Sequence, residues 1–376
     1  SVLTACSSDD NNDNGGNGNN GNGNEIENGT ILKGTITSDV TLAAGNTYKL
    51  SGEYIVEEGA TLHIEEGVKI IAVYDDIADY ILVKQGGKIN AVGTPDKPIV
   101  MTSEKEEPGA WGGIHICGRA HTNAEGGKGS SEIGGAVYGG NDDADNSGTL
   151  QYIRLEYTGF AFDEEHEANG ISFYGVGNGT IVDHCQAYKG SDDGFEFFGG
   201  SVNVSNLVAV SCSDDSFDWT EGWNGKGTNL VAYQEDKSTL GYDCDCLMEC
   251  DNNGSNNAAT PVAHPVLKNL ILVGNGGSKQ GIRLRAGTEV EIDNAKVCGK
   301  GQPLTVETAL TENALKNGTS KLTNITLTSE LSSKEGIYTH ADFIAVTSNK
   351  VDANLSYSSF EDIRKECSWM NGSWVK

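Results

Sequence analysis

Proline and long apolar runs are scarce in this 376-residue chain, which contains 6 prolines but 50 glycines. So much glycine excludes a mainly helical protein, because a glycine inside a helix costs roughly 1 kcal/mol relative to alanine. No run of about 18 apolar residues reads as a transmembrane span. Several motifs of common chemistry are also missing, namely a phosphate loop, a GxSxG elbow, an HExxH pair and a dinucleotide fingerprint.

Positive charge is the second shortage. Lysine and arginine total 26 against 54 aspartates and glutamates, so the formal net charge is −28. A surface of this sign repels nucleic acid and anionic lipid headgroups, and we expect neither as a partner. It suits bound cations, or it is simply a well-solvated surface.

The first residues resemble the end of a bacterial lipoprotein signal, because Leu3-Thr4-Ala5-Cys6 is similar to a lipobox. The resemblance implies that residues 1–5 are a signal remnant and that Cys6 is lipidated. Residues 7–28 are almost wholly Ser, Asp, Asn, Gly and Glu, which predicts a flexible, disordered tether. The acidic residues directly after Cys6 resemble a surface-export signal. We therefore expect a lipoprotein exposed on the outer membrane, which contacts the membrane only through its lipid anchor.

The other eight cysteines are an even number, which favours disulfides in an oxidising compartment. Three of them crowd into one acidic segment with a histidine nearby: Cys244, Cys246, Cys250 and His264. A zinc site is the alternative there, although the spacing is not the usual paired CxxC.

Short phrases of the sequence recur every 22 to 31 residues. The aligned segments are 56–64 with 83–91 (offset 27), 148–159 with 179–190 (offset 31), and 206–210 with 229–233 (offset 23), 269–273 and 324–327. Repeats of this length with short β-rich runs predict a parallel β-solenoid whose strands stack at about 4.8 Å. A β-sandwich would also give many short strands, but it would not need repeated motifs at this interval.

The amino-acid sequences of the repeated segments also resemble those of known proteins. "GATLHIEEGVKI", "GGKINAVGTPDKPIVMTS", "WGGIHICG", "DDGFEFFGG" and "NLVAV" resemble right-handed parallel β-helix lipoproteins common in Bacteroidetes. The resemblance implies an all-β, pectin-lyase-like β-helix as one domain over residues 29–376. That superfamily contains lyases, glycosidases, esterases, tailspikes and adhesins, so the fold does not select an activity. We expect long loops on one face, at 118–147, 160–169 and 236–265, and a short helix near 309–317.

An acidic motif occurs twice, as Asp-Asp-Gly-Phe-Glu at 192–196 and as Asp-Asp-Ser-Phe-Asp at 214–218. If the two copies lie one coil apart in register, six carboxylates stack: Asp192, Asp193, Glu196, Asp214, Asp215 and Asp218. Two like charges about 5 Å apart cost roughly 3 kcal/mol at an effective dielectric near 20. The stack therefore needs a cation such as Ca²⁺, or raised pKa values that suit acid catalysis, or backbone amides that the aspartates cap. We expect the intervening phenylalanines to stack inside the coil.

Basic residues follow the acidic motifs along the chain. Pectate- and alginate-type lyases use calcium with a lysine or arginine base, so the resemblance makes Lys279, Arg283 and Arg285 candidates. The sequence alone leaves a solvent-facing pair of arginines as the alternative. Candidate catalytic residues for a lyase or hydrolase are Asp193, Asp215 and Arg283, and Arg285 is a candidate clamp for an anionic sugar.

Two tryptophans flank an acid just after the second acidic motif. Trp219, Glu221 and Trp223 would bind a sugar if the indoles are exposed, or anchor a loop if they are buried. Together these features predict a surface protein that binds an extracellular ligand, which we take to be a glycan. A calcium-dependent polysaccharide lyase or glycoside hydrolase acting on acidic polysaccharide is the alternative.

Overall fold

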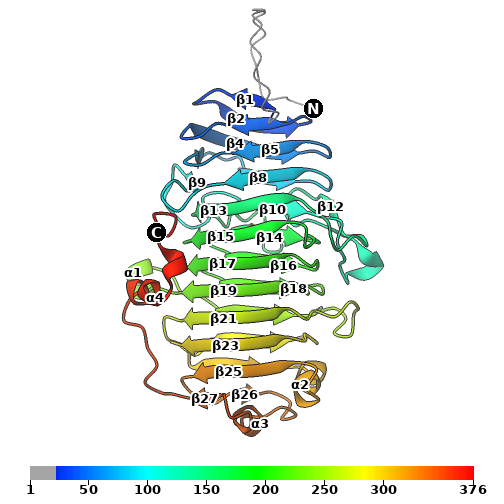
Figure 1. The fold of residues 1–376 in the computed structure, drawn as a ribbon, viewed down its shortest axis with the longest axis vertical. Helices are drawn as coiled ribbons and strands as arrows, with labels where there is room; N and C mark the ends of the chain where they lie inside the picture. Colours follow the sequence, from blue (N-terminus) through cyan, green and yellow to red (C-terminus); the bar gives the residue numbers. More distant parts are fainter. Residues whose placement is uncertain (1–22) are drawn as a thin grey trace, which may run out of the picture.

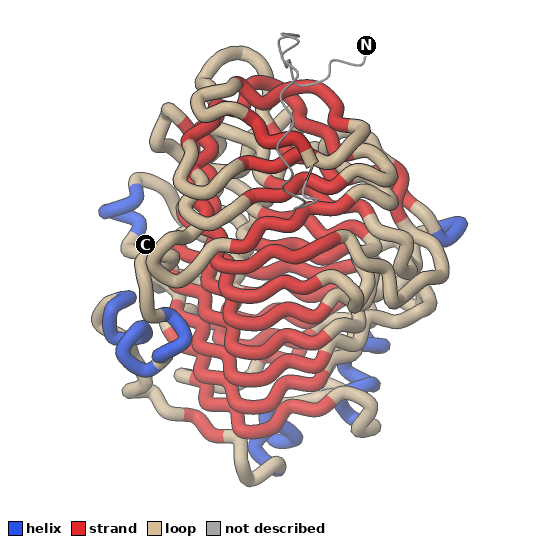
Figure 2. Tube along the Cα trace, turned by 45° about the horizontal axis from the view of Figure 1, so that its top comes forward, coloured by secondary structure: helices blue, strands red, loops and turns tan. Residues whose placement is uncertain are grey.

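The computed structural model describes residues 23–376, and Cys6 and most of the expected tether lie outside this range. Twenty-five of its strands join one sheet whose neighbouring strands run parallel. The sheet winds into a stack of coils (Figure 1), and Figure 2 shows the helices on the outside of that stack. The predicted all-β parallel β-helix is confirmed.

Each full coil contributes one short strand to what we call the first sheet. Its strands are β7 (Tyr80–Val83), β10 (Ile114–Cys117), β14 (Ile171–Tyr174), β16 (Phe195–Phe198), β18 (Phe217–Thr220), β20 (Met248–Asp251), β22 (Gln280–Arg285), β24 (Gln302–Val306) and β26 (Ser332–Ser333).

The other two sides of each coil come from one long strand that bends in the middle. These strands are β13 (Gly148–Glu156), β15 (Ile181–Tyr188), β17 (Asn203–Val210), β19 (Lys226–Tyr233), β21 (Val266–Val273), β23 (Glu291–Cys298) and β25 (Lys321–Leu327). The bend falls on a residue with positive φ, as at Asn206, Asn229 and Asn269 (φ 57, 59 and 61). Asparagine tolerates this left-handed conformation better than most residues, which explains why "Asn-Leu" recurs at the bend.

The remaining elements complete the two ends of the coil and its loops. They are β1 (Asn24–Ile26), β2 (Ile31–Ile36), β3 (Val40–Leu42), β4 (Thr47–Val56), β5 (Thr61–Ile64), β6 (Lys69–Ala72), β8 (Lys88–Val92), β9 (Ile99–Ser103), β11 (Gly129–Ser130), β12 (Val137–Tyr138), β27 (Lys350–Val351), α1 (Lys237–Leu240), α2 (Ala309–Lys316), α3 (His340–Ala345), α4 (Phe360–Glu366) and the 3₁₀ turns η1 (Glu125–Gly127) and η2 (Ser368–Met370). Helix α2 confirms the predicted short helix. Strand β1 pairs with β3, so the coil begins before residue 29, where the domain was expected to start.

Aromatic rings stack inside the coil at the spacing of its rungs, as expected. Phe195 lies over Phe217 with ring centres 5.6 Å apart, and Phe197 stacks on Phe173 at 5.0 Å. All four are essentially buried. Because alternate residues of a strand point to opposite faces, this inward set places Glu196 and Asp218 on the outer face.

Strand pairing confirms the offsets of 27, 23 and 22, but it corrects the offset of 31. Glu156 pairs with Tyr188, which is an offset of 32. The bends at Tyr152 and His184 are also 32 residues apart and have nearly equal φ (52 and 54). The bends must stack for the coils to nest, and the pairing keeps the offset of 32 along the whole of both strands. A slip of one residue exchanges inward and outward side chains.

The expected long loops flank the first sheet. Residues 118–147 follow β10, and 157–170 precede β14. The segment 236–265 is not a single excursion, because β20 divides it into one loop before a strand of the first sheet and one loop after it. Among the described residues, no helix has the length and apolar character needed to cross a membrane.

Candidate functional site

Six carboxylates gather on the outer face of the first sheet and in the turns that lead into it. We call Asp192, Asp193, Glu196, Asp214, Asp215 and Asp218 the carboxylate cluster. Glu196 pairs in register with Asp218 on the neighbouring strands β16 and β18. The backbone N–H of Asp215 donates to Asp193 Oδ1 at 2.9 Å. The stacking expected from the repeated motif is therefore confirmed.

The turns before these strands carry a ladder of side-chain caps. Asn169 Oδ1 accepts a hydrogen bond from the backbone N–H of Asp193. In the same way, Asp193 Oδ1 accepts from the backbone N–H of Asp215, and Asp215 Oδ1 accepts from the backbone N–H of Cys246. Local capping, one of the three alternatives, thus accounts for one oxygen of Asp193 and one of Asp215. It does not account for the other oxygens, which lie among the neighbouring acids.

The oxygens of the cluster form two close sets, each of which fits around one ion. Oxygens of Asp193, Glu196 and Asp218 lie within 4.8 Å of one another, and so do those of Asp192, Asp193 and Asp214. Ca²⁺ binds oxygen at 2.3–2.6 Å, so two ligands on opposite sides of one ion are about 4.8 Å apart. Each set can therefore contact one Ca²⁺, with Asp193 shared between the two sets.

A third copy of the motif extends the cluster, and the sequence analysis missed it. Asp245-Cys-Leu-Met-Glu249 continues the column, since Glu249 pairs with Asp218, and Arg283 pairs with Glu249 on the next strand. The carboxylates of Asp215, Asp218 and Glu249 form a further set within 4.8 Å. The offset of 31 residues between 214–218 and 245–249, with acids at the first and fifth places, was the available signal.

Burial shifts the acids of the cluster toward their protonated forms. Burial, together with the charges of Glu196 and Asp214, raises the pKa of Asp192 to about 10. Burial and the charge of Glu132 raise the pKa of Glu196 to about 8. The pKa values of Asp193, Asp215 and Asp218 also lie well above the usual range, first because of burial and then because of neighbouring carboxylates. Without a cation, the cluster therefore holds protons at neutral pH.

Basic side chains of the described residues lie along one edge of the cluster. Arg285 donates to Glu249 at 2.6 Å and to Asp251 at 2.7 Å, while Arg283 donates to Glu307 at 3.0 Å. Lys279 pairs with Asp245 at 3.8 Å. Within the described chain, none of the six cluster residues forms an ion pair. The column thus changes from acidic to basic along the axis of the coil.

A comparison with known families matches residues 34–375 to the pectate-lyase like beta helix domain. The chain belongs to this family. No curated protein and no solved structure gives a significant match. A pectate-lyase-like domain fits a role that involves glycans, while the family alone does not distinguish binding from cleavage.

In this pectate-lyase-like coil the two tryptophans near the cluster are buried. Trp219 and Trp223 are each 1% exposed, and their indole N–H groups donate to Thr288 Oγ1 and to the carbonyl of Val202. Of the two alternatives, the one in which exposed indoles bind a sugar is therefore wrong, because both rings are buried in the aromatic interior. Glu221 accepts from Tyr138 Oη at 2.9 Å, so it anchors the loop 118–147.

The eight described cysteines are all buried, and none forms a disulfide, contrary to expectation. The four residues considered for zinc are also not brought together. Cys250 lies in the interior, and His264 contacts Glu289 and Glu291 instead. Of the four, Cys246 alone joins a close set, with Asp215 and Asp245.

Proposed function

We propose that this protein binds an acidic glycan on the outer face of its first sheet, with Ca²⁺ held in the carboxylate cluster. The observation that carries this proposal is the cluster itself, whose buried acids have no basic partner in the described chain. Asp193, Glu196 and Asp218 would hold one ion, and Asp192 and Asp214 would extend the ligand set. A bound ion would neutralise the cluster and offer its open positions to carboxylates of the polymer.

The basic edge supplies the second part of the proposed site. Arg283 and Arg285 lie two residues apart on β22, and both side chains reach the outer face. Next to Arg283 an open hollow of about 390 Å³ is also lined by Thr308 and Lys334. Guanidinium groups suit bidentate contacts to carboxylates, so a uronate here would lie beside an ion held in the cluster.

Several contacts favour binding over cleavage. Asp193 and Asp215 are 3% and 1% exposed, and each spends one oxygen on a backbone cap. A lyase base must lose its proton, but Arg283 is ion-paired with Glu307. Nearby Asp251 and Glu249 raise the pKa of Arg285 further, although burial opposes them.

A calcium-dependent lyase or a glycoside hydrolase remains the second candidate, for one reason. Without a cation in the cluster, the pKa of Glu196 is raised to about 8, so its carboxyl group keeps its proton at neutral pH, as the general acid of a hydrolase must. In that case Asp193, Asp215 and Arg283 would be its partners.

Calorimetric titration with polygalacturonate and alginate oligomers tests the proposal. We expect binding in millimolar Ca²⁺, no binding in EDTA, and at least tenfold weaker binding by Arg283→Ala. The control is Arg119→Ala, which removes an arginine whose ion pair with Glu58 is exposed. Equal binding with and without Ca²⁺ would contradict the role of the ion. Unsaturated or reducing-end products that disappear in Asp193→Ala would favour the enzyme.

We also propose that the protein is anchored to the outer membrane through a lipid on Cys6. The lipobox-like residues 3–6 and the polar stretch after them support this proposal. Expression behind a complete lipoprotein signal peptide, in a bacterium that processes lipoproteins, should place the chain in the membrane fraction, and Cys6→Ala should release it. Retention of the variant in that fraction would argue against a lipid anchor.

A further inference from the structure

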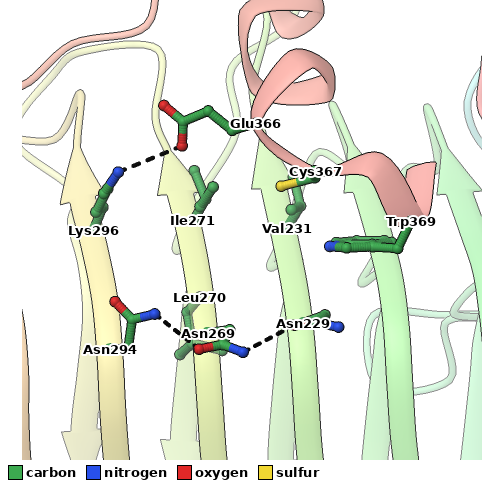
Figure 3. A pocket seen from close by; sticks show the side chains of 10 residues that line it. All are labelled: Asn229, Val231, Asn269, Leu270, Ile271, Asn294, Lys296, Glu366, Cys367 and Trp369. Atoms are coloured by element: carbon green, nitrogen blue, oxygen red, sulfur yellow. Dashed lines mark hydrogen bonds and ion pairs between the residues drawn. The ribbon is translucent and has the colours of Figure 1, made fainter. Parts of the chain in front are cut away.

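A second groove lies on a different side of the coil, between the bends of the long strands and the C-terminal segment (352–376). It has a volume of about 360 Å³. Figure 3 shows a row of asparagines on one wall, with α4 and η2 on the other. None of its residues belongs to the carboxylate cluster or the basic edge, so a ligand in this groove would be independent of the proposed function.

The asparagine row presents unused hydrogen-bonding capacity to the groove. Asn269 Nδ2 donates to Asn229 Oδ1 at 3.1 Å, and Asn294 Nδ2 donates to Asn269 Oδ1 at 2.8 Å. A primary amide has two N–H donors and a carbonyl with two lone pairs, so the ladder uses about half of each group. Asn324 turns away to Asp293, which leaves exposed Asn294 as the open end of the row.

The opposite wall offers an aromatic ring. Trp369 extends from η2 toward Val231 (Figure 3). It is half-buried, whereas the other four tryptophans of the chain are at most 1% exposed. Partly exposed Ile271 adds aliphatic surface to the floor, beside Leu270, which is 1% exposed. The groove is therefore amphipathic, with amides along one side and an indole on the other.

The charges at the groove cancel. Lys296 Nζ lies 3.4 Å from Glu366 Oε2, and this pair spans one end of the groove. A charged ligand would have to displace one partner, and an anion would also face a protein with a net charge of −28. The surroundings favour an uncharged ligand with one polar edge and one C–H face, a description that fits a pyranose ring.

We propose that this groove binds a sugar ring of a neutral glycan. One face of the ring packs on Trp369, and the ring hydroxyls exchange hydrogen bonds with the amides of Asn229, Asn269 and Asn294. The groove volume matches small-ligand sites, which begin at about 300 Å³.

Tryptophan fluorescence provides a direct test, because Trp369 is the half-exposed one of five. Xylo-, manno- and cello-oligosaccharides at millimolar concentration are added while acrylamide quenching is measured. We expect at least one of them to protect the fluorescence, with calorimetry giving a matching dissociation constant. Trp369→Phe should keep part of the affinity, while Trp369→Ala should lose at least tenfold.

A second variant tests the groove without changing the C-terminal segment, which Trp369→Ala could disturb. Asn294→Gly removes the open amide and still accepts the backbone φ of 64. It should weaken binding several-fold at a temperature where it is fully folded, although loss of its ladder bond to Asn269 lowers the melting temperature slightly. Arg283→Ala should bind neutral oligosaccharides normally. The proposal is overturned if no oligosaccharide of the panel binds, if Trp369→Ala binds as well as the wild type, or if Arg283→Ala abolishes binding.

Discussion

At the scale of single residues, the surroundings of Asp193 favour two opposite protonation states of its carboxyl group. One oxygen caps the N–H of Asp215, which favours a carboxylate. Burial and the nearby charges of Asp218 and Asp192 favour the protonated acid more strongly. A bound cation would relieve this conflict, because it stabilises the carboxylate and leaves the cap in place.

Two substitutions at this position separate the roles. Asp193→Asn keeps an oxygen for the cap and removes the charge, so without Ca²⁺ at pH 8 we expect it to match or exceed wild-type stability. Asp193→Ala leaves the buried N–H of Asp215 without its cap, and its free energy of unfolding should be about 1–3 kcal/mol below that of the asparagine variant. Urea denaturation measures both, and equal stability of the two variants would contradict the capping role.

Residue contacts were predictable only where they follow from register. The repeated acidic motif placed Glu196 beside Asp218 correctly, since strand stacking fixes that pair. The exposure of the tryptophan side chains was not predicted. Trp219 lies two residues after Phe217 on β18 and shares its inward face, so alternation continued past the acidic motif would have predicted a buried ring.

At the scale of the elements, the asparagine ladder determines how neighbouring long strands align. Its members have left-handed backbone conformations, and they join coils through side-chain hydrogen bonds from Asn206 to Asn294. In the upper coils rings replace amides, and Tyr152 stacks on His184 with centres 4.4 Å apart. Both devices fix the bend of one coil over that of the next.

Replacing Asn269 tests the cost of that bend. Asn269→Ala and Asn269→Gly both lose the ladder bonds, but alanine is also strained at φ 61. We expect the glycine variant to be about 1 kcal/mol more stable by chemical denaturation. At Ser205, a position of β17 without positive φ, the order should reverse. An alanine variant as stable as glycine at position 269 would contradict the account.

The sequence predicted these elements well because neighbouring coils repeat one another's chemistry. It failed where the turn lengths change, as between β13 and β15, where the offset is 32 and not 31. It also failed at 245–249, where Cys246 replaces the second acid of the motif and only the first and fifth acids keep their places. Repeats reveal side chains that must stack, and they say little about the lengths of the turns between them.

At the scale of the whole molecule, the C-terminal segment ties distant coils together. After β27 the chain returns along the outside of the coil, and the C-terminus lies halfway up it (Figure 1). The backbone N–H of Trp374 donates to Pro95 O, and that of Lys376 donates to Gln186 Oε1. No repeat predicts this return, because the segment resembles none of the coils.

Removing one anchor should loosen the whole segment. Trp374 is fully buried against Tyr152 and His184. Trp374→Ala should lower the free energy of unfolding by about 3–5 kcal/mol and open residues 357–376 to limited proteolysis. The matched control is Trp369→Ala, which removes a half-buried indole from the same segment and should cost less. Equal effects of the two would argue against an anchoring role for Trp374.

The cluster also links the stability of the molecule to pH. The folded-state pKa values of Glu196 and Asp192 are raised to about 8 and about 10, from 4.5 and 3.8. The folded protein thus binds more protons than the unfolded chain between these values, so its stability without a cation falls as pH rises through them. The net charge of −28 acts in the same direction. In EDTA, Asp193→Asn, which removes one carboxyl group of raised pKa, should show a smaller fall than the wild type.

The most direct measurement is therefore a Ca²⁺ titration of the wild type and Asp193→Asn at pH 8, followed by thermal unfolding and by calorimetry in buffers of different ionisation enthalpy. The account predicts that Ca²⁺ raises the wild-type melting temperature and releases protons from the cluster as it binds, and that Asp193→Asn shows much less of both. A wild-type melting temperature that is the same in EDTA and in millimolar Ca²⁺, with no proton release, would contradict it.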